Sequence, residues 1–336
     1  MKVISFLCVV IVLYCLSLPM KSVFSPPVVQ PSPTVGREDG GIPKKQLGKR
    51  VYYDLNDLKQ MGLVKGSVNW KQETCSIEKN DDRFVFERNN TVFLHNGYYE
   101  SIDTPALFLN KTCYLPETVF KKVQSSSKKQ PTMEQVVTSY SAKQLANHLS
   151  FLRSPIPGSH VSSIDSSLPG AVRAYRNGVH EGLDWYTYGT GKVINTKTAV
   201  LSMGSGLVVR SDQNYHEMST KERNHWLAIG SKNSGQTPDY ILDKLRGKTV
   251  WIQFENGVMA RYCHLSKIPK SIKAGTHVKA GDIVGFVGNT GTSDGALHNN
   301  KGLHLHLDIL IYGNWLWGNY TVAERRMILE SVFNRF

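Results

Sequence analysis

The stretch HLHLDI at residues 304–309 decides the fold of the C-terminal half of this chain. Apolar and polar side chains alternate along it without a break. In a β-strand this pattern sends His304, His306 and Asp308 to one face and the leucine and isoleucine side chains to the other. We therefore predict a strand with one face in a core and a polar row on the other. The two imidazoles can converge on one small site, where Asp308 can orient a ring by accepting its N–H.

Two further segments carry histidines that could join such a site. His180 and Asp184 stand four residues apart in HEGLD, and both are acceptable ligands of a divalent ion such as zinc. The segment is not HExxH, and Gly182 disfavours a helix, so we place the pair on a strand edge or turn. His264 lies in the segment RYCHLS. Taken alone, each of these histidines is more often structural than metal-binding.

The rest of the chain is mainly β in pattern. Short β-type runs separated by Asn, Asp and Gly turns fill residues 51–125, which predicts a small β-rich module. Apolar spacing predicts one helix over 133–152 and another over 322–333. From about residue 170 onward, strand-like runs are separated by glycines. We find no internal repeat.

The N-terminal residues predict export. The run from Val3 to Leu18 is apolar, but its 16 residues fall short of the about 20 that span a bilayer comfortably, so it is a signal sequence or a short anchor. A Pro/Gly-rich stretch follows and predicts an extended tether. In an oxidising compartment Cys75 and Cys113 could form a disulfide, a pairing that the sequence leaves open. Cys263 is predicted to be a buried, inert thiol.

Composition limits the class of protein and of partner. With 40% hydrophobic and 20% charged residues, the chain is not wholly disordered, collagenous or a multi-span membrane protein. Its net charge of +13 predicts a polyanionic partner, such as nucleic acid, anionic lipid or a bacterial wall polymer. The basic residues are spread rather than clustered with aromatic residues, which disfavours specific nucleic-acid binding.

The order of the histidine motifs resembles that of the lysostaphin/LytM-type zinc endopeptidases, which cut bacterial peptidoglycan. In both, an HxxxD motif is followed by Tyr-x-His-Leu-Ser, a Gly-rich hairpin and HLH. Here the hairpin corresponds to residues 272–291, and the resemblance covers about residues 171–320. It implies an antiparallel β-sheet domain of the LytM/lysostaphin type, preceded by the β-rich module and a bridging helix.

The resemblance also implies a site. His180, Asp184 and His306 match the ligands of one Zn²⁺, and Asp308 would support the site from behind. Three protein ligands leave a fourth position for a water whose pKa falls toward about 7. His264 and His304 match the two unligated histidines of the family. We assign His304 as the general base and His264 as the stabiliser of the oxyanion.

The predicted organisation follows from these observations. It consists of a signal sequence or membrane anchor at 1–24, a tether at 25–50, the β-rich module at 51–125, a helical bridge and linker at 126–169, the zinc metallopeptidase domain at 170–320 and a C-terminal helix at 321–336. Two stretches, 211–248 and 293–302, are longer than in the family pattern. They form groove walls or a lid, or else solvated decoration.

The predicted function is that of an exported cell-envelope endopeptidase that hydrolyses stem or crossbridge peptides of peptidoglycan. No nucleic-acid partner is expected, and the N-terminal segment allows association with a membrane. The sequence does not indicate an oligomeric state. Two alternatives remain open: a non-catalytic activator of another wall hydrolase, and a basic protein that only binds the wall.

Overall fold

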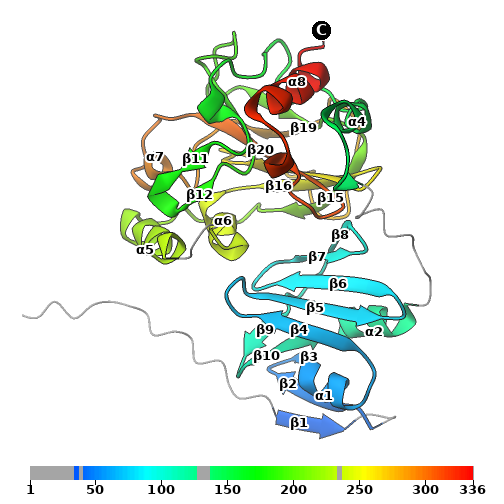
Figure 1. The fold of residues 1–336 in the computed structure, drawn as a ribbon. Coiled ribbons are helices and arrows are strands. Elements are labelled where there is room, and N and C mark those ends of the chain that lie inside the picture. Colours follow the sequence, from blue (N-terminus) through cyan, green and yellow to red (C-terminus); the bar gives the residue numbers. More distant parts are fainter. Residues whose placement is uncertain (1–33, 38–40, 127–136, 233–236, 336) are drawn as a thin grey trace, which may run out of the picture.

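The structure is a computed structural model that describes residues 34–37, 41–126, 137–232 and 237–335 (Figure 1). The predicted leader at 1–24 lies outside these residues. Across the described ranges, no helix combines the length and apolar character needed to cross a membrane. The chain is mainly β, as predicted, and its strand pairs are antiparallel.

Residues 34–37 and 41–126, called the N-terminal module below, form two five-stranded sheets. The first has the order β1 (Thr34–Arg37), β2 (Pro43–Leu47), β3 (Arg50–Asp54), β10 (Thr112–Pro116) and β9 (Leu107–Leu109). The second is a meander of β4 (Lys65–Asn69), β5 (Thr74–Lys79), β6 (Asp82–Glu87), β7 (Val92–His95) and β8 (Tyr98–Ser101). Helices α1 (Leu55–Gln60) and α2 (Glu117–Ser125) complete the module.

The N-terminal module has an apolar core of its own. Phe84 and Phe86 of β6 and Leu115 of β10 are buried in it. Cys75 and Cys113 lie in the same core as free thiols. Burial, together with a hydrogen bond to the Cys75 thiol, raises the pKa of Cys113. The two cysteines are therefore neighbours in space, as a disulfide would require, although the structure holds them reduced.

The tether predicted at 25–50 is wrong for part of its length. Strands β1 and β2 lie within it and pair with each other, with Arg37 opposite Pro43. Proline is tolerated here because it is the first residue of β2, where the strand tolerates the missing N–H donor. Gly41 takes a φ of +78°, which glycine adopts without strain. Residues 34–37 and 43–47 of the predicted tether are therefore paired strands, and residues 25–33 and 38–40 lie outside the described ranges.

Residues 137–232 and 237–335, called the C-terminal domain below, are built on a six-stranded sheet. Its order is β13 (Leu183–Tyr186), β20 (His304–Ile311), β17 (Val258–Cys263), β16 (Val250–Phe254), β15 (Gly206–Ser211) and β18 (His277–Val278). The domain also has two two-stranded sheets. One pairs β11 (Val172–Arg173) with β12 (Gly178–Val179), and the other pairs β14 (Ala199–Leu201) with β19 (Ile283–Phe286). The predicted alternation in β20 is confirmed, because Leu305, Leu307 and Ile309 join the main core.

Helices cover the core side of this sheet. The helix α8 (Val322–Phe333) coincides with its predicted bounds and begins with a capping box formed by Thr321 and Glu324. The helix predicted over 133–152 is shorter, since α4 spans Ala142–His148. Ser141 begins α4 by capping the N–H of Gln144, so the helix cannot run back through it. Helix α4 packs on α8 within the same core (Figure 1).

The Gly-rich stretch at 272–291 is not a hairpin of two mutually paired strands, which corrects the expectation from the motif. Strand β18 pairs with β15 in the large sheet, whereas β19 pairs with β14. Gly281, with a φ of +92°, lies between β18 and β19. The two strands therefore diverge into different sheets.

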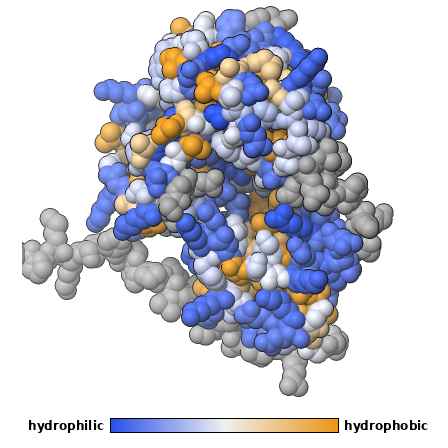
Figure 2. All heavy atoms as spheres, viewed as in Figure 1, coloured by the Kyte–Doolittle hydropathy of each residue, from blue (hydrophilic) through white to orange (hydrophobic). Residues whose placement is uncertain are grey.

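The N-terminal module packs against one face of the six-stranded sheet (Figure 1). This face, called the histidine face below, carries His304, His306, Asp308 and Leu310 of β20. Val92 and Tyr99 of the module are buried with Leu310, Met259 and Trp251 of the sheet. The backbone N–H of Tyr99 also donates to Gln253 Oε1 at 2.9 Å. These apolar groups are buried at the contact, whereas hydrophilic residues cover much of the face seen in Figure 2.

Candidate active site

Three of the predicted site residues meet at one end of the histidine face. Asp184 of β13 stands directly opposite His306 of β20 in the strand register. His180 follows β12 and is fixed by two backbone hydrogen bonds of 2.7 Å, to Ala171 and Gly170. The Asp184 Oδ1 atom lies 3.0 Å from His180 Nε2 and 2.8 Å from His306 Nδ1. These two nitrogens are 3.0 Å apart.

This arrangement fits a metal ion. The three ligand atoms form a compact cluster, and four-coordinate zinc with bonds of about 2.0–2.1 Å needs ligand atoms about 3.3 Å apart. The other nitrogen of each histidine ring makes a hydrogen bond away from this cluster. His180 Nδ1 donates to the Leu168 carbonyl at 3.0 Å, and His306 Nε2 donates to Asp308 Oδ1 at 2.7 Å. A metal ion that displaces any proton from the facing nitrogens would therefore meet a lone pair of each ring.

Asp308 supports His306 from behind and is itself held by arginine. Arg246 Nε donates to Asp308 Oδ2 at 2.8 Å, and Arg261 Nη1 lies 3.6 Å from the same oxygen. Burial alone would raise the pKa of Asp308, but Arg246 and His306 hold that pKa well below its usual range. Burial likewise would lower the pKa of His306, but Asp308 and Asp184 raise it to about 9. The carboxylate of Asp308 is therefore ionised and orients the ring.

A second group of possible ligands is less suited to a metal. It consists of Cys263, His306 and Asp308. Burial raises the pKa of the Cys263 thiol well above its ordinary value, so the thiol stays protonated and is a poor ligand. Asp308 is also engaged with two guanidinium groups. Cys263 is buried, consistent with the inert thiol predicted from the sequence.

His264 and His304 face the same space without joining the ligand cluster. Their rings lie 4.7 Å apart between centroids, and His264 lies 5.6 Å from the ring of His306. His264 Nδ1 donates to the Thr290 carbonyl, and His304 Nδ1 donates to the Gly302 carbonyl, each at 2.7 Å. Within the described residues, Nε2 of His264 has no hydrogen-bond partner, and Nε2 of His304 lies 3.9 Å from Asp184 Oδ1. Burial lowers the pKa of both histidines, and for His264 the neighbouring imidazoles lower it further.

Local backbone and side-chain packing orient these two rings. Strand β17 ends at Cys263, and His264 takes a φ of +60°, which a non-glycine residue adopts only where its surroundings enforce it. Its backbone N–H donates to the Arg246 carbonyl at 2.9 Å. The ring of Tyr186 stacks on His304 at a centroid distance of 4.2 Å.

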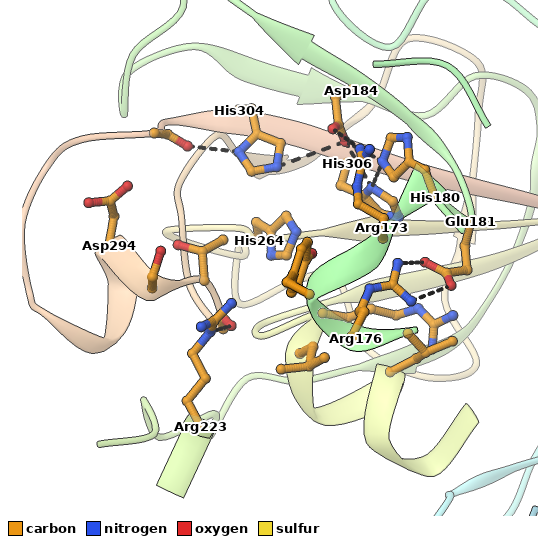
Figure 3. A pocket seen from close by; sticks show the side chains of 18 of the residues that line it. Arg173, Arg176, His180, Glu181, Asp184, Arg223, His264, Asp294, His304 and His306 are labelled. Carbon is orange, nitrogen blue, oxygen red and sulfur yellow. Dashed lines mark hydrogen bonds and ion pairs between the residues drawn. The ribbon is translucent and has the colours of Figure 1, made fainter. Parts of the chain in front are cut away.

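The five histidine and aspartate side chains open into a cavity of about 530 Å³ (Figure 3). The stretch 211–248 provides one wall, since it folds into α5 (Thr220–Ser231) and α6 (Asp239–Leu245), whose residues line the cavity. The stretch 293–302 provides another through α7 (Ser293–Ala296). Both insertions are therefore walls of the site and not solvated decoration.

The cavity residues that sequence reasoning missed include four arginines, Arg173, Arg176, Arg223 and Arg246, and Tyr186. Tyr186 could have been found, because it lies two residues after Asp184 on a strand and so shares its face. No pattern pointed to the arginines. Two of them come from the insertion at 211–248, whose helices have no sequence link to the motifs.

The part of the chain that holds this site matches a known protein family. Residues 178–316 match the model of peptidase family M23. The matched stretch is similar to this family over 139 residues. It includes His180, Asp184, His264, His304 and His306.

Several solved structures resemble the chain. The catalytic domain of the antimicrobial peptidase lysostaphin from Staphylococcus simulans is 20% identical, with 44% of this chain and 73% of that chain covered and a TM-score of 0.25. A mutant catalytic domain of the prophage-encoded M23 protein EnpA from Enterococcus faecalis is 20% identical, covering 48% and 87%, with a TM-score of 0.29. A putative peptidase M23 from Pseudomonas aeruginosa is 16% identical, covering 89% and 84%, with a TM-score of 0.27.

Proposed function

We propose that this protein is a zinc-dependent endopeptidase that hydrolyses peptide bonds in the stem or crossbridge peptides of bacterial peptidoglycan. One observation carries the proposal. Within the stretch that matches family M23, the three candidate ligand atoms lie 2.8–3.0 Å apart, with two further imidazoles facing the same cavity. Such a group has the donors for a catalytic metal and the side chains for proton transfer beside it.

His180, Asp184 and His306 would hold the ion. Bound there, zinc supplies a water of lowered pKa and polarisation of the scissile carbonyl. His304 Nε2, 3.9 Å from Asp184 Oδ1, is placed to accept a proton from a water beside the ligand cluster. The bond to the Gly302 carbonyl keeps its other nitrogen protonated, and stacking on Tyr186 prevents the ring from turning away.

His264 would act on the opposite side of the reacting carbonyl. Its Nδ1–H is held by Thr290, so Nε2 is the atom that meets the substrate. As negative charge develops on the carbonyl oxygen, this nitrogen would take up a proton from solvent and donate it in a hydrogen bond to the oxyanion. The proton taken up by His304 can return to the leaving amine, which completes the hydrolysis. Both roles require only small movements of rings that the backbone already orients.

The charge of the chain supports a wall substrate. A net charge of +13 favours approach to an acidic polymer, and the predicted export would bring the protein to the cell envelope. The similar solved structures include the antimicrobial peptidase lysostaphin and a prophage-encoded M23 protein. We therefore propose peptidoglycan peptides as the substrate and the cell envelope as the location.

The test is digestion of purified peptidoglycan by the full-length protein, with zinc measured on the same sample. We expect release of soluble fragments with new amino termini, about one zinc per chain, and loss of release after chelation. His306→Ala should abolish release. The matched control is His277→Ala, an exposed histidine of β18 outside the cavity, which should leave release unchanged. One bound zinc without any release would contradict the proposal and favour a wall-binding protein or an activator.

A further inference from the structure

Arginines dominate the charged lining of the cavity, and all but one of them have a carboxylate partner. Four arginines line it. Three of these lie within 4 Å of a carboxylate, namely Arg176 with Glu181, Arg246 with Asp308 and Arg173 with Asp184. The Arg176 pair is bidentate, with distances of 2.9 and 2.7 Å. Their charges are thus balanced within the protein.

Arg223 is the exception. Its Nε donates to the Gly291 carbonyl at 3.1 Å, and in the part of the chain that the structure describes no carboxylate comes within ion-pair distance of it. Glu217 and Asp294 act on Arg223 only from outside ion-pair distance, and Glu217 already accepts the Gly291 N–H at 3.0 Å. The two terminal nitrogens of Arg223 are left to the cavity. A planar guanidinium in this state offers a fork of donors that matches a carboxylate.

The position of Arg223 disfavours its charge in the unliganded protein. Burial lowers its pKa, and the nearby Tyr175, Glu217 and Asp294 offset this effect only in part. It also lies at the start of α5, where the helix dipole opposes a cation. A half-buried, unpaired cation lowers stability, so packing alone does not account for this residue. A bound anion would remove the penalty.

Arg223 is tied to the same backbone segment as His264. Its carbonyl partner, Gly291, follows Thr290, whose carbonyl holds His264. Figure 3 shows the Arg223 side chain extending from its helix toward the space that His264 faces. An anion on Arg223 would therefore lie beside the reacting centre, on the side away from Asp184.

We propose that Arg223 binds a carboxylate of the substrate, and that the substrate is a stem peptide with free carboxylates rather than an uncharged crossbridge. The inference rests on the proposed function, since it names the peptide that the candidate active site takes. A crossbridge made of neutral residues would leave the Arg223 guanidinium unpaired in the closed complex, which is unfavourable. A carboxylate on a stem peptide would pair with it bidentately.

The test compares two forms of one peptide on the full-length protein. A synthetic stem peptide with free carboxylates and the same peptide with all carboxylates amidated are titrated into metal-free protein. We expect about 10–100-fold tighter binding of the free acid, the range of a charge-assisted hydrogen bond. Arg223→Gln should abolish this preference, and Arg223→Lys should retain part of it. Lys221→Gln, which removes an exposed charge from the same helix, should keep it.

Activity separates this inference from the proposed function. With zinc-loaded protein, the same preference should appear in kcat/KM and disappear in Arg223→Gln. Equal binding of acid and amide, or a preference that survives in Arg223→Gln, would overturn the inference even if both peptides were cleaved. A preference for the acid without cleavage of either peptide or of peptidoglycan would uphold the anion site and overturn the proposed function. A thermal melt of Arg223→Gln checks that the variant is folded.

Discussion

The two ends of the histidine face differ in what lies against them. At one end, His304 and His306 of β20 border a cavity whose lining is mainly polar, with Asp308 behind His306. At the other end, Leu310 lies only two residues from Asp308 on the same strand and is buried under Val92 and Tyr99 of the N-terminal module. An apolar patch of this kind needs a cover, whereas charged groups can stay at a solvent-filled site if they are paired. The polar or apolar character of the side chains at alternate positions of β20 thus determines which part of this face forms the site and which part is covered.

The two ends also depend on different forces. The polar end rests on charge pairing, with Asp308 balanced by Arg246 and Arg261. The apolar end rests on buried area, which contributes about 25 cal/mol per Å², and on a few hydrogen bonds between the parts. Substitutions at neighbouring positions of β20 should therefore have separable effects on metal binding and on packing.

Asp308→Asn should have the largest effect. Removing the charge deprives Arg261 of its carboxylate partner and leaves Arg246 only Asp239 at 3.8 Å, which should lower the free energy of unfolding by about 3–5 kcal/mol. Weaker orientation of His306 should also lower zinc affinity about 10–100-fold. Denaturant unfolding of the metal-free protein and competition with a chelator measure the two quantities. Asp282→Asn, an exposed aspartate outside the site, is the control. Unchanged zinc affinity would show that Asp308 does not orient the ring.

Leu310→Ala should affect stability alone. The side chain is buried at the contact between the two parts, so its truncation should lower the free energy of unfolding by about 2–5 kcal/mol. Zinc affinity should stay that of the parent, because the metal ligands are not touched. The same two measurements apply. A large loss of zinc affinity would mean that the two ends are coupled.

Ser101→Ala probes the edge of the same contact. The Ser101 hydroxyl of the N-terminal module donates to the Val209 carbonyl of β15 at 2.6 Å. Losing this bond should cost about 0.5–1.5 kcal/mol, with no change in metal binding. Ser125→Ala serves as the control, because the hydroxyl of Ser125 is exposed and water can replace its bond. Equal melting temperatures for both variants would show that the bond does not contribute to docking.

Glu87→Gln should have the smallest effect and a distinct pH dependence. Burial, then Asp239 and Asp243 of α6, raise the pKa of Glu87, while Arg261 and Asn90 lower it in part. A folded pKa above the unfolded value means that the folded state holds the proton longer. Stability is then greatest below about pH 4, near the unfolded pKa, and falls as pH rises through the folded pKa.

The variant removes this titration from the contact between the parts. Glu87→Gln should therefore melt at a higher temperature than the parent at pH 7.5 and at the same temperature at pH 4. Thermal melts across this range provide the measurement. A parent protein whose stability rises with pH over the same range, and falls in the variant, would contradict the assignment to Glu87.

The sequence by itself determined the elements whose signals are local. The alternation at 304–309 indicates a strand and the face of each residue, because side chains in a strand alternate regardless of what packs on them. The bounds of α8 follow from its apolar spacing and its capping residues. The candidate ligands came from the order of motifs, and the structure brings His180, Asp184 and His306 together as that order implies.

Only the tertiary structure decided which distant segments of the chain contact the histidine face. Arg223 and Arg246 reach the cavity from two helices of an insertion, and contacts between distant segments leave no periodic signal in the chain. The same holds for strand pairing in the stretch 272–291 and for the strands within the predicted tether. Leu310 could be placed on the face of His306 from sequence, but not the module that covers it. Local pattern fixes where a side chain points, whereas its partner depends on how the whole chain packs.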